Sequence, residues 1–363
     1  MQSPVALKAM MSKVIWPLAA VVLAAVLLGV IVHSPPARAW TLPERLADQE
    51  FWKLVTDSSE PGGYFRNSDI TNLTSNEMLY EHVLSDLLKR VKPGGAYLGV
   101  GPEQNYTYIA ALKPRIAIIF DIRRGNLDMQ LMYKALFELS KDRADFVAML
   151  FSKQRPSGLT PSVSATQLFD AFDRVPAVNE TAFSRNLAAV EDRLTKTHAL
   201  PLLRRDLDGI AEIYRNFYEA GFAVRPSPSY DDLMTATDER GAERSYLATE
   251  ENYRFMKDLE SRNLVVPVVG DFGGPMAIRT VAKYLKANGA TVAAFYLSNV
   301  EQYLRQDGKW DAFCRNIAAL PLDSSSTFIR SESGFAGSFR RVGPGFVSSL
   351  GQITSDIKPC AGR

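Results

Sequence analysis

The chain has 363 residues, of which 46% are hydrophobic, and its 42 basic residues nearly balance 40 acidic ones. A chain of this size and hydrophobic content can bury a substantial core, as one large domain or as one domain with an insertion. The near-neutral balance excludes the basic surplus that is typical of proteins binding nucleic acid or anionic lipid. We therefore expect no nucleic-acid partner.

The first 39 residues have the three parts of an export signal. Lys8 and Lys13 precede an apolar run at residues 14–32, and the segment ends in Ala37-Arg38-Ala39, a small-residue cleavage pattern. The alternative is an uncleaved anchor, because 19 apolar residues are about enough to span a bilayer. We expect a signal peptide and a periplasmic or secreted protein that contacts a membrane only through an uncleaved N-terminus. The rest of the chain has 39 basic and 40 acidic residues.

Residues 40–155 have the pattern of the first half of an α/β domain. Continuous apolar runs at residues 96–100 and 116–120 predict strands that are covered on both faces, as in a parallel sheet. Thr74, with Glu77 three residues later, has the spacing of a capping box and predicts the start of a helix. Apolar spacing predicts helices at residues 43–55, 78–91, 104–112, 126–139 and 143–151.

Residues 156–262 have the pattern of a helical insertion. The composition shifts to Pro, Ser, Gly and Thr at residues 154–164, which is typical of a loop or boundary. No convincing strand follows for about a hundred residues. Helical patterns instead occupy residues 166–174, 181–194 and 202–220.

The α/β pattern resumes over residues 263–363. Strands are predicted at residues 264–269, 291–296 and 327–330, and a helix is predicted at residues 276–287. Strands that alternate with helices predict a doubly wound, mostly parallel sheet.

The two cysteines, Cys314 and Cys360, both lie in this last part of the chain. An oxidising compartment would permit a disulfide between them, and two separate thiols are the alternative. The spacing does not decide between the two, because a bridge also requires the two Cα atoms to come within reach.

Polar or glycine-rich segments follow each of the first four predicted strands. Ligands of doubly wound sheets bind outside the carboxyl ends of the strands, near the point where the strand order reverses. We therefore predict a small-molecule site at this rim. The candidate binding residues are Gly99, Gly101, Glu103, Asp121, Arg123, Asp271, Gly273 and Asn299.

Each candidate has a physical reason and a structural alternative. Gly99 and Gly101 would let the backbone approach a ligand closely, but a GxG pair also makes a tight turn. Asp121 lies 20 residues beyond Gly101, about where a carboxylate meets ribose hydroxyls, yet it could cap the next helix. Arg123 could clamp an anionic group or pair with a surface acid. Gly273 lies where a helix N-terminus would bind an anion.

Catalytic residues are not assigned by any motif. The histidines and cysteines have no zinc-type spacing, no G-x-S-x-G motif occurs, and we predict no metal site. The rim acids Glu103, Asp121, Asp271 and Glu301 could bind a hard cation or act as an acid/base pair. An extracytoplasmic hydrolase that uses these acids is therefore an alternative function.

Residues 97–105 and 118–126 together resemble class I S-adenosylmethionine-dependent methyltransferases. Gly99 and Gly101 match two glycines of the first motif of that family, and Asp121 matches its ribose-binding acid. The resemblance implies a methyltransferase-like Rossmann fold and S-adenosylmethionine as the cofactor.

The chain departs from the methyltransferase pattern at Tyr97, where an acid is usual, and at Glu103, which replaces the third glycine. Export would also separate the enzyme from this cytosolic cofactor. A fuller stretch, from residues 75–77 to residues 269–271, resembles an uncharacterised family of exported bacterial proteins and lipoproteins, which implies a fold rather than an activity. We expect a small-ligand-binding protein with or without methyl transfer, with an active methyltransferase and a hydrolase as alternatives.

Overall fold

The structure is a computed structural model, and it describes residues 42–64, 70–225, 227–333 and 346–358. All of these residues belong to one compact unit, Thr41–Arg363. The predicted export signal at residues 1–39 lies outside the described residues. Within the described ranges, no helix combines the length and the apolar character that crossing a membrane requires.

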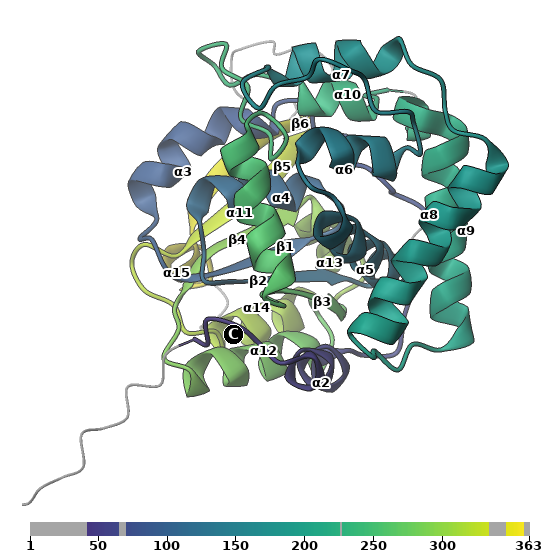
Figure 1. The fold of residues 1–363 in the computed structure, drawn as a ribbon. Coiled ribbons are helices and arrows are strands. Elements are labelled where there is room, and N and C mark those ends of the chain that lie inside the picture. Colours follow the sequence, from purple (N-terminus) through teal and green to yellow (C-terminus); the bar gives the residue numbers. More distant parts are fainter. Residues whose placement is uncertain (1–41, 65–69, 226, 334–345, 359–363) are drawn as a thin grey trace, which may run out of the picture. The chain divides into compact units, whose positions relative to one another are not determined.

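A six-stranded sheet in the order β3-β2-β1-β4-β5-β6 forms the centre of the fold (Figure 1). Neighbouring strands from β3 to β5 are parallel, and β6 is antiparallel to β5. The strands are β1 (Ala96–Val100), β2 (Ile116–Asp121), β3 (Val265–Val269), β4 (Val292–Ser298), β5 (Thr327–Ser333) and β6 (Phe346–Gln352). The α/β class and the mostly parallel sheet are therefore confirmed.

Helices cover both faces of the sheet (Figure 1). α4, α5 and α11 pack together on one face, and α2, α12 and α14 pack together on the other. The helices of the described residues are α2 (Asp48–Ser58), α3 (Leu84–Arg90), α4 (Gln104–Leu112), α5 (Arg124–Leu139), α6 (Arg143–Leu150), α7 (Ala165–Asp173), α8 (Glu180–Asp192), α9 (Arg204–Ala220), α10 (Tyr230–Met234), α11 (Glu250–Ser261), α12 (Ala277–Ala287), α13 (Val300–Gln306), α14 (Trp310–Ala318) and α15 (Ile353–Asp356).

The local sequence explains the βαβ unit that positions the site. β1 and β2 are almost entirely apolar and buried, as expected for strands covered on both faces. α4 ends at Leu112 because Lys113 adopts a left-handed conformation and Pro114 cannot continue a helix. β1 pairs with β2 on one side and with β4 on the other, so the strand order reverses between β1 and β4.

Residues 156–262 contain α7–α11 and, in the part that the structure describes, no strand of the sheet. α9 packs against α5, which connects these helices to the face of the sheet. In Figure 1 α7 lies beside α10 above the sheet, and α8 lies beside α9.

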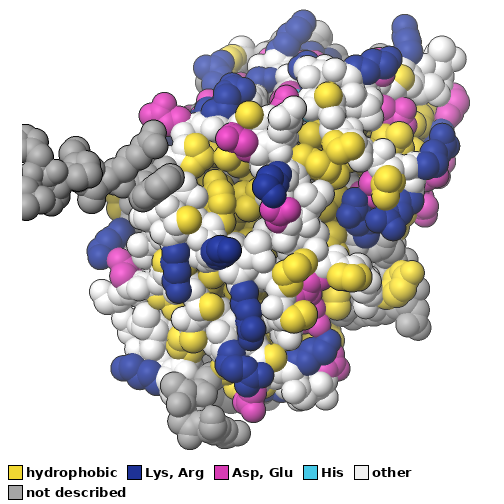
Figure 2. All heavy atoms as spheres, turned by 90° about the horizontal axis from the view of Figure 1, so that it is seen from below, with side chains coloured by type: hydrophobic (Ala, Val, Ile, Leu, Met, Phe, Trp, Pro, Cys, Tyr) yellow, Lys and Arg dark blue, Asp and Glu magenta, His cyan; other side chains and the backbone are white. Residues whose placement is uncertain are grey.

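On the face shown in Figure 2, basic, acidic and apolar side chains are interspersed.

The structure differs from the sequence analysis in one predicted helix start and in several elements that were not predicted. The predicted helix start at Thr74 is wrong, because helical structure begins with a short 3-10 turn at Tyr80–Val83 that continues into α3. β6 was not predicted, because it is a half-buried edge strand with two serines and a glycine, which are weak strand formers. The helices α10, α11, α13, α14 and α15 were not predicted either.

The choice between a disulfide and two separate thiols is not decided by the described residues. Cys314 is buried on α14. Cys360 lies outside the described residues.

Candidate functional site

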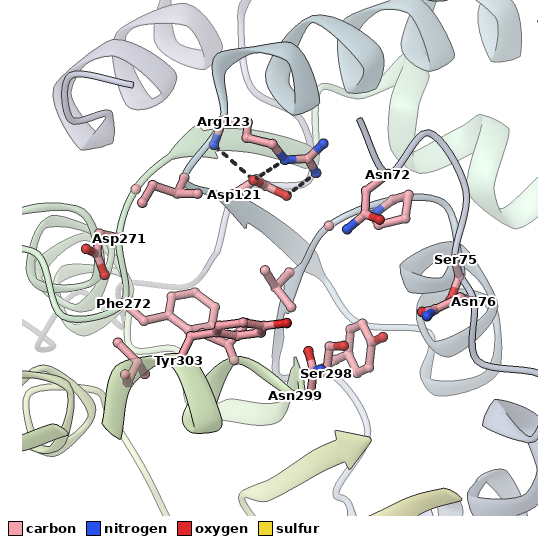
Figure 3. Close-up of a pocket in the computed structure, with 18 of the residues that line it drawn as sticks. Asn72, Ser75, Asn76, Asp121, Arg123, Asp271, Phe272, Ser298, Asn299 and Tyr303 are labelled. Carbon is pink, nitrogen blue, oxygen red and sulfur yellow. Dashed lines mark hydrogen bonds and ion pairs between the residues drawn. The ribbon is translucent and has the colours of Figure 1, made fainter. Parts of the chain in front are cut away.

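A cavity of about 230 Å³ lies at the carboxyl ends of β1–β4, where the strand order reverses (Figure 3). The carboxyl ends of the strands supply one part of its lining, and the segment at residues 72–77 supplies another. Figure 3 shows Asp121 and Arg123 on one side of the cavity, and Ser298 and Asn299 on the opposite side. The cavity therefore occupies the rim where the sequence predicted a ligand.

The structure brings together five of the eight predicted site residues. The residues that line the cavity are Gly101, Asp121, Arg123, Asp271 and Asn299. Those outside its lining are Gly99, Glu103 and Gly273. The charged members of the first group nevertheless form bonds within the protein, which changes what they offer a ligand.

Asp121 and Arg123 bind each other. Arg123 Nε donates to Asp121 Oδ1 at 2.9 Å, and a terminal guanidinium nitrogen donates to Oδ2 at 2.6 Å (Figure 3). The Arg123 backbone N–H also donates to Oδ1 at 2.9 Å, and the guanidinium reaches the carbonyl oxygen of Thr71. The side chains are only 8% and 2% exposed, so the pair forms a closed wall of the cavity and anchors the segment that begins near Thr71.

Asp271 is held in a similar way. Lys309 Nζ donates to Asp271 Oδ2 at 2.6 Å, and this contact raises the pKa of Lys309. The N–H of Gly273 donates to Asp271 Oδ1 at 2.8 Å, which closes a turn after β3. The carboxylate of Asp271 therefore stabilises the loop in which the anion site was predicted.

That anion site, the N-terminus of α12, is occupied by a carboxylate of the chain itself. Glu60 Oε1 accepts the backbone N–H groups of Met276 at 2.7 Å and Ala277 at 2.9 Å. Its Oε2 accepts the N–H of Asp271 at 3.2 Å. The positive end of a helix favours a negative charge, and Glu60 supplies it here without a ligand.

Gly99 serves internal packing. A Cβ at this position would collide with the side chain of Asn105 and would approach the Tyr97 ring to 2.9 Å. Asn105 Nδ2 donates to the carbonyl oxygens of Val100 at 2.9 Å and Pro102 at 2.8 Å. Asn105 thus fixes the turn between β1 and α4, and the absence of a side chain at Gly99 makes room for it.

Gly101 and Glu103 have different roles in the same turn. Gly101 adopts φ +81°, a conformation that glycine accepts readily, and it lines the cavity. Glu103 is fully buried beneath the turn, where its Oε1 accepts the N–H of Ser75 at 3.1 Å. Burial raises the pKa of Glu103 to about 7. The carboxyl group of Glu103 therefore lies outside the cavity lining. It stands at the position where the first methyltransferase motif has its third glycine.

A second polar pair, Glu77 and Ser298, was missed by sequence reasoning. Ser298 Oγ donates to Glu77 Oε1 at 2.6 Å, and Gln104 Nε2 donates to Oε2 at 3.0 Å. Burial raises the pKa of Glu77, although both hydrogen bonds act in the opposite direction. The signal in the sequence was ambiguous, because Glu77 also had the spacing of a helix cap after Thr74.

Aromatic and aliphatic side chains form another part of the cavity wall. Phe272 and Tyr303 lie close to each other in Figure 3, across the cavity from Asn72. Tyr64 also belongs to the lining and is 73% exposed. The cavity therefore combines apolar ring faces with amide, hydroxyl and carboxyl groups.

The four rim acids proposed as an acid cluster do not converge. Glu103 and Glu301 do not belong to the cavity lining, and Glu301 is paired with Arg330 at 2.8 Å. Among the residues that the structure describes, no group of three or more His, Cys, Asp or Glu side chains could hold a metal ion.

The fold and the cavity define an α/β protein with a doubly wound sheet and a pocket at the reversal of its strand order. Comparison with known families matches residues 72–205 and 203–342 to a family described as a domain of unknown function, DUF7790. These two matches cover most of the chain, so the protein belongs to this family. No curated protein matches the sequence.

Proposed function

We propose that this protein binds a small, uncharged organic molecule in the cavity at the strand ends, and that it does so in a methyltransferase-like fold without using S-adenosylmethionine. One observation carries the proposal: a cavity of about 230 Å³ at the strand-order reversal, into which the ends of β1–β4 and the segment at residues 72–77 place polar groups. Binding sites of doubly wound proteins occur at this position.

The arrangement of charged groups argues against S-adenosylmethionine. Asp121, expected to bind ribose hydroxyls, already accepts three hydrogen bonds from Arg123. The space beside Gly99 is filled by Asn105. The volume is also below the roughly 300–1,000 Å³ typical of pockets for drug-sized ligands. A smaller molecule than this cofactor suits the cavity.

The lining also disfavours an anionic ligand. Its acidic side chains outnumber the basic ones, since it contains Glu77, Asp121, Asp271 and Asp307 against Arg123 and Lys309. An anionic ligand would meet this excess of carboxyl groups and a closed Asp121–Arg123 pair. Amide groups at Asn72, Asn76 and Asn299 can both donate to and accept from hydroxyl or carbonyl groups.

Export is part of the proposal. The charged start, apolar run and small-residue site at residues 1–39 support a mature protein that begins at Trp40. N-terminal sequencing of the protein recovered from a secreting bacterial host tests this, with Trp40 as the expected first residue. An intact Met1 in the membrane fraction would contradict cleavage.

Ligand-detected NMR tests binding with a panel of uncharged monosaccharides, nucleosides and small carboxylic esters. We expect at least one compound to bind, and Val300→Phe, which fills the cavity, to weaken that binding at least about tenfold. Leu203→Phe is the matched control, because Leu203 is 54% exposed and lies outside the lining. No binding to the unmodified chain, or binding that Val300→Phe leaves unchanged, would contradict the proposal.

A further inference from the structure

Ser298 occupies an unusual backbone position at the cavity. It is the last residue of β4, and α13 begins at Val300 immediately after the connecting Asn299. Its φ of +50° lies in the left-handed region, which residues with a side chain rarely adopt. A sharp strand-to-helix turn of this kind projects the serine hydroxyl beyond the carboxyl edge of the sheet, as in the nucleophile elbow of serine hydrolases. The glycines of that motif are missing here.

The hydroxyl of Ser298 contacts a buried carboxyl group. Its Oγ donates to Glu77 Oε1 at 2.6 Å, and Glu77 is only 3% exposed. Gln104 Nε2 donates to the second oxygen of Glu77 at 3.0 Å, and Ser75 Oγ donates to Gln104 Oε1. Glu77 is therefore oriented by a third group, which is the arrangement found for the base of an activated nucleophile.

A purely structural tie between β4 and the segment at residues 72–77 is the alternative. Such a tie would need neither a positive φ at Ser298 nor access to the cavity. Ser298 and Glu77 instead both line the cavity, and Ser298 is only half-buried. Strained residues that face a cavity are found more often at functional sites than in structural contacts.

We propose that Ser298 and Glu77 form a nucleophile–base pair that hydrolyses small, uncharged carboxylic esters, an inference that rests on the proposed binding of such a molecule in this cavity. Ser298 Oγ attacks the ester carbonyl carbon while its proton passes to the Glu77 carboxylate. The C–O bond to the alcohol then breaks, and the alcohol leaves with that proton. Water, deprotonated by Glu77, then attacks the acyl–Ser298 ester. The bond from the acyl carbon to Ser298 Oγ breaks, the proton on Glu77 passes to Oγ, and the carboxylic acid leaves.

Asn299 supplies a donor for the oxyanion that forms in both steps. Its side chain lines the cavity and makes no hydrogen bond to the start of α13. An amide N–H directed at the developing negative charge is the type of group that stabilises such intermediates. The aromatic wall formed by Phe272 and Tyr303 would hold the apolar part of the ester.

A small alkyl fluorophosphonate, applied to the full chain and followed by peptide mass spectrometry, tests the pair. We expect phosphonylation at Ser298, and none there in Ser298→Ala. Glu77→Gln keeps the size of the side chain and should slow labelling about 100-fold or more, because it removes the base. Ser355→Ala, at an exposed serine of α15, is the matched control and should label like the unmodified chain.

The rate of p-nitrophenyl acetate hydrolysis gives the second readout. We expect the unmodified chain and Ser355→Ala to hydrolyse this ester at similar rates, Glu77→Gln to be slower, and Ser298→Ala to be inactive. Absence of label at Ser298 while a panel compound still binds would overturn the inference and leave the proposed binding intact. Equal labelling rates in the unmodified chain and in a folded Glu77→Gln variant would overturn the role of Glu77 as base. Absence of both label and ligand binding would contradict both proposals.

Discussion

The two sides of the cavity use their polar groups differently. On the β2 and β3 side, the charged groups that match a cofactor-binding pattern bind one another, as in the Asp121–Arg123 and Asp271–Lys309 pairs. On the β4 side, Ser298 contacts a buried carboxyl and remains accessible to the cavity. A motif residue at a strand end can therefore be part of the scaffold, while the group that we propose as reactive, Ser298, lies outside any motif.

The largest effect is expected from Arg123→Met, which leaves Asp121 buried without its partner. Removing one member of a buried ion pair typically destabilises a protein by about 3–5 kcal/mol. The free energy of unfolding, measured by urea denaturation, should fall by that amount. Asp121→Asn combined with Arg123→Met should recover part of the loss, because no uncompensated charge remains.

The exposed Lys53–Asp57 pair provides the control for this measurement. Its side chains are 74% and 52% exposed, so Lys53→Met should change the free energy of unfolding by less than about 1 kcal/mol. Equal effects of Arg123→Met and Lys53→Met would contradict the scaffold role of the β2 side.

A smaller effect is expected from Gly99, near the end of β1, and Gly101, just after it. Gly99→Ala places a methyl group against Asn105 and Tyr97, and overpacking of this kind costs about 1–3 kcal/mol. Gly101→Ala adds a side chain in open space but at φ +81°, which costs roughly 1–2 kcal/mol. Gly94 has the same φ and no atom within 4 Å, so Gly94→Ala measures the conformational cost alone.

Thermal denaturation of the three alanine variants compares these costs. We expect Gly99→Ala to have the lowest melting temperature, and Gly94→Ala and Gly101→Ala to be close to each other. If Gly99→Ala were the most stable of the three, Gly99 would not be required for packing.

The smallest effect concerns His198, outside the cavity. His198 Nε2 contacts Glu138 at 2.7 Å and Nδ1 contacts Asp48 at 2.7 Å, so both ring nitrogens face carboxylates. The hydrogen bond to Glu138 and, to a smaller extent, the one to Asp48 raise the pKa of His198, whereas burial lowers it. Its contribution to stability is therefore complete below pH ~6.5 and is lost as the pH rises through the higher pKa of the folded protein.

The free energy of unfolding as a function of pH tests the role of His198. One proton contributes a slope of at most about 1.4 kcal/mol per pH unit, and His198→Gln should remove the downward slope above pH ~6.5. Ligand binding in the cavity should not change. A pH profile identical in the variant would show that the bridge does not titrate with folding.

Much of the fold could be predicted from the sequence because its signals are local. The continuous apolar residues of β2 and the Lys113-Pro114 helix stop need no knowledge of distant residues. The position of the cavity followed from strand alternation and the known geometry of doubly wound sheets. β6 could not be predicted, since an edge strand beside β5 depends on its partner rather than on its own composition.

The roles of the site residues could not be predicted in the same way. Asp121 and Arg123 are two residues apart, and nothing in their spacing separates a ligand clamp from an internal pair. Glu77 and Ser298 are 221 residues apart, so their contact exists only in the folded chain. A sequence pattern thus indicated the rim, while the pairing of side chains across it required the structure.

Calorimetric titration of the full chain with S-adenosylmethionine distinguishes most directly between a scaffold and a cofactor site at the motif residues. We expect no binding heat at millimolar cofactor. Saturable binding that is lost in a folded Asp121→Ala variant would contradict the scaffold role, because Asp121 would then bind the ribose of the cofactor instead of Arg123.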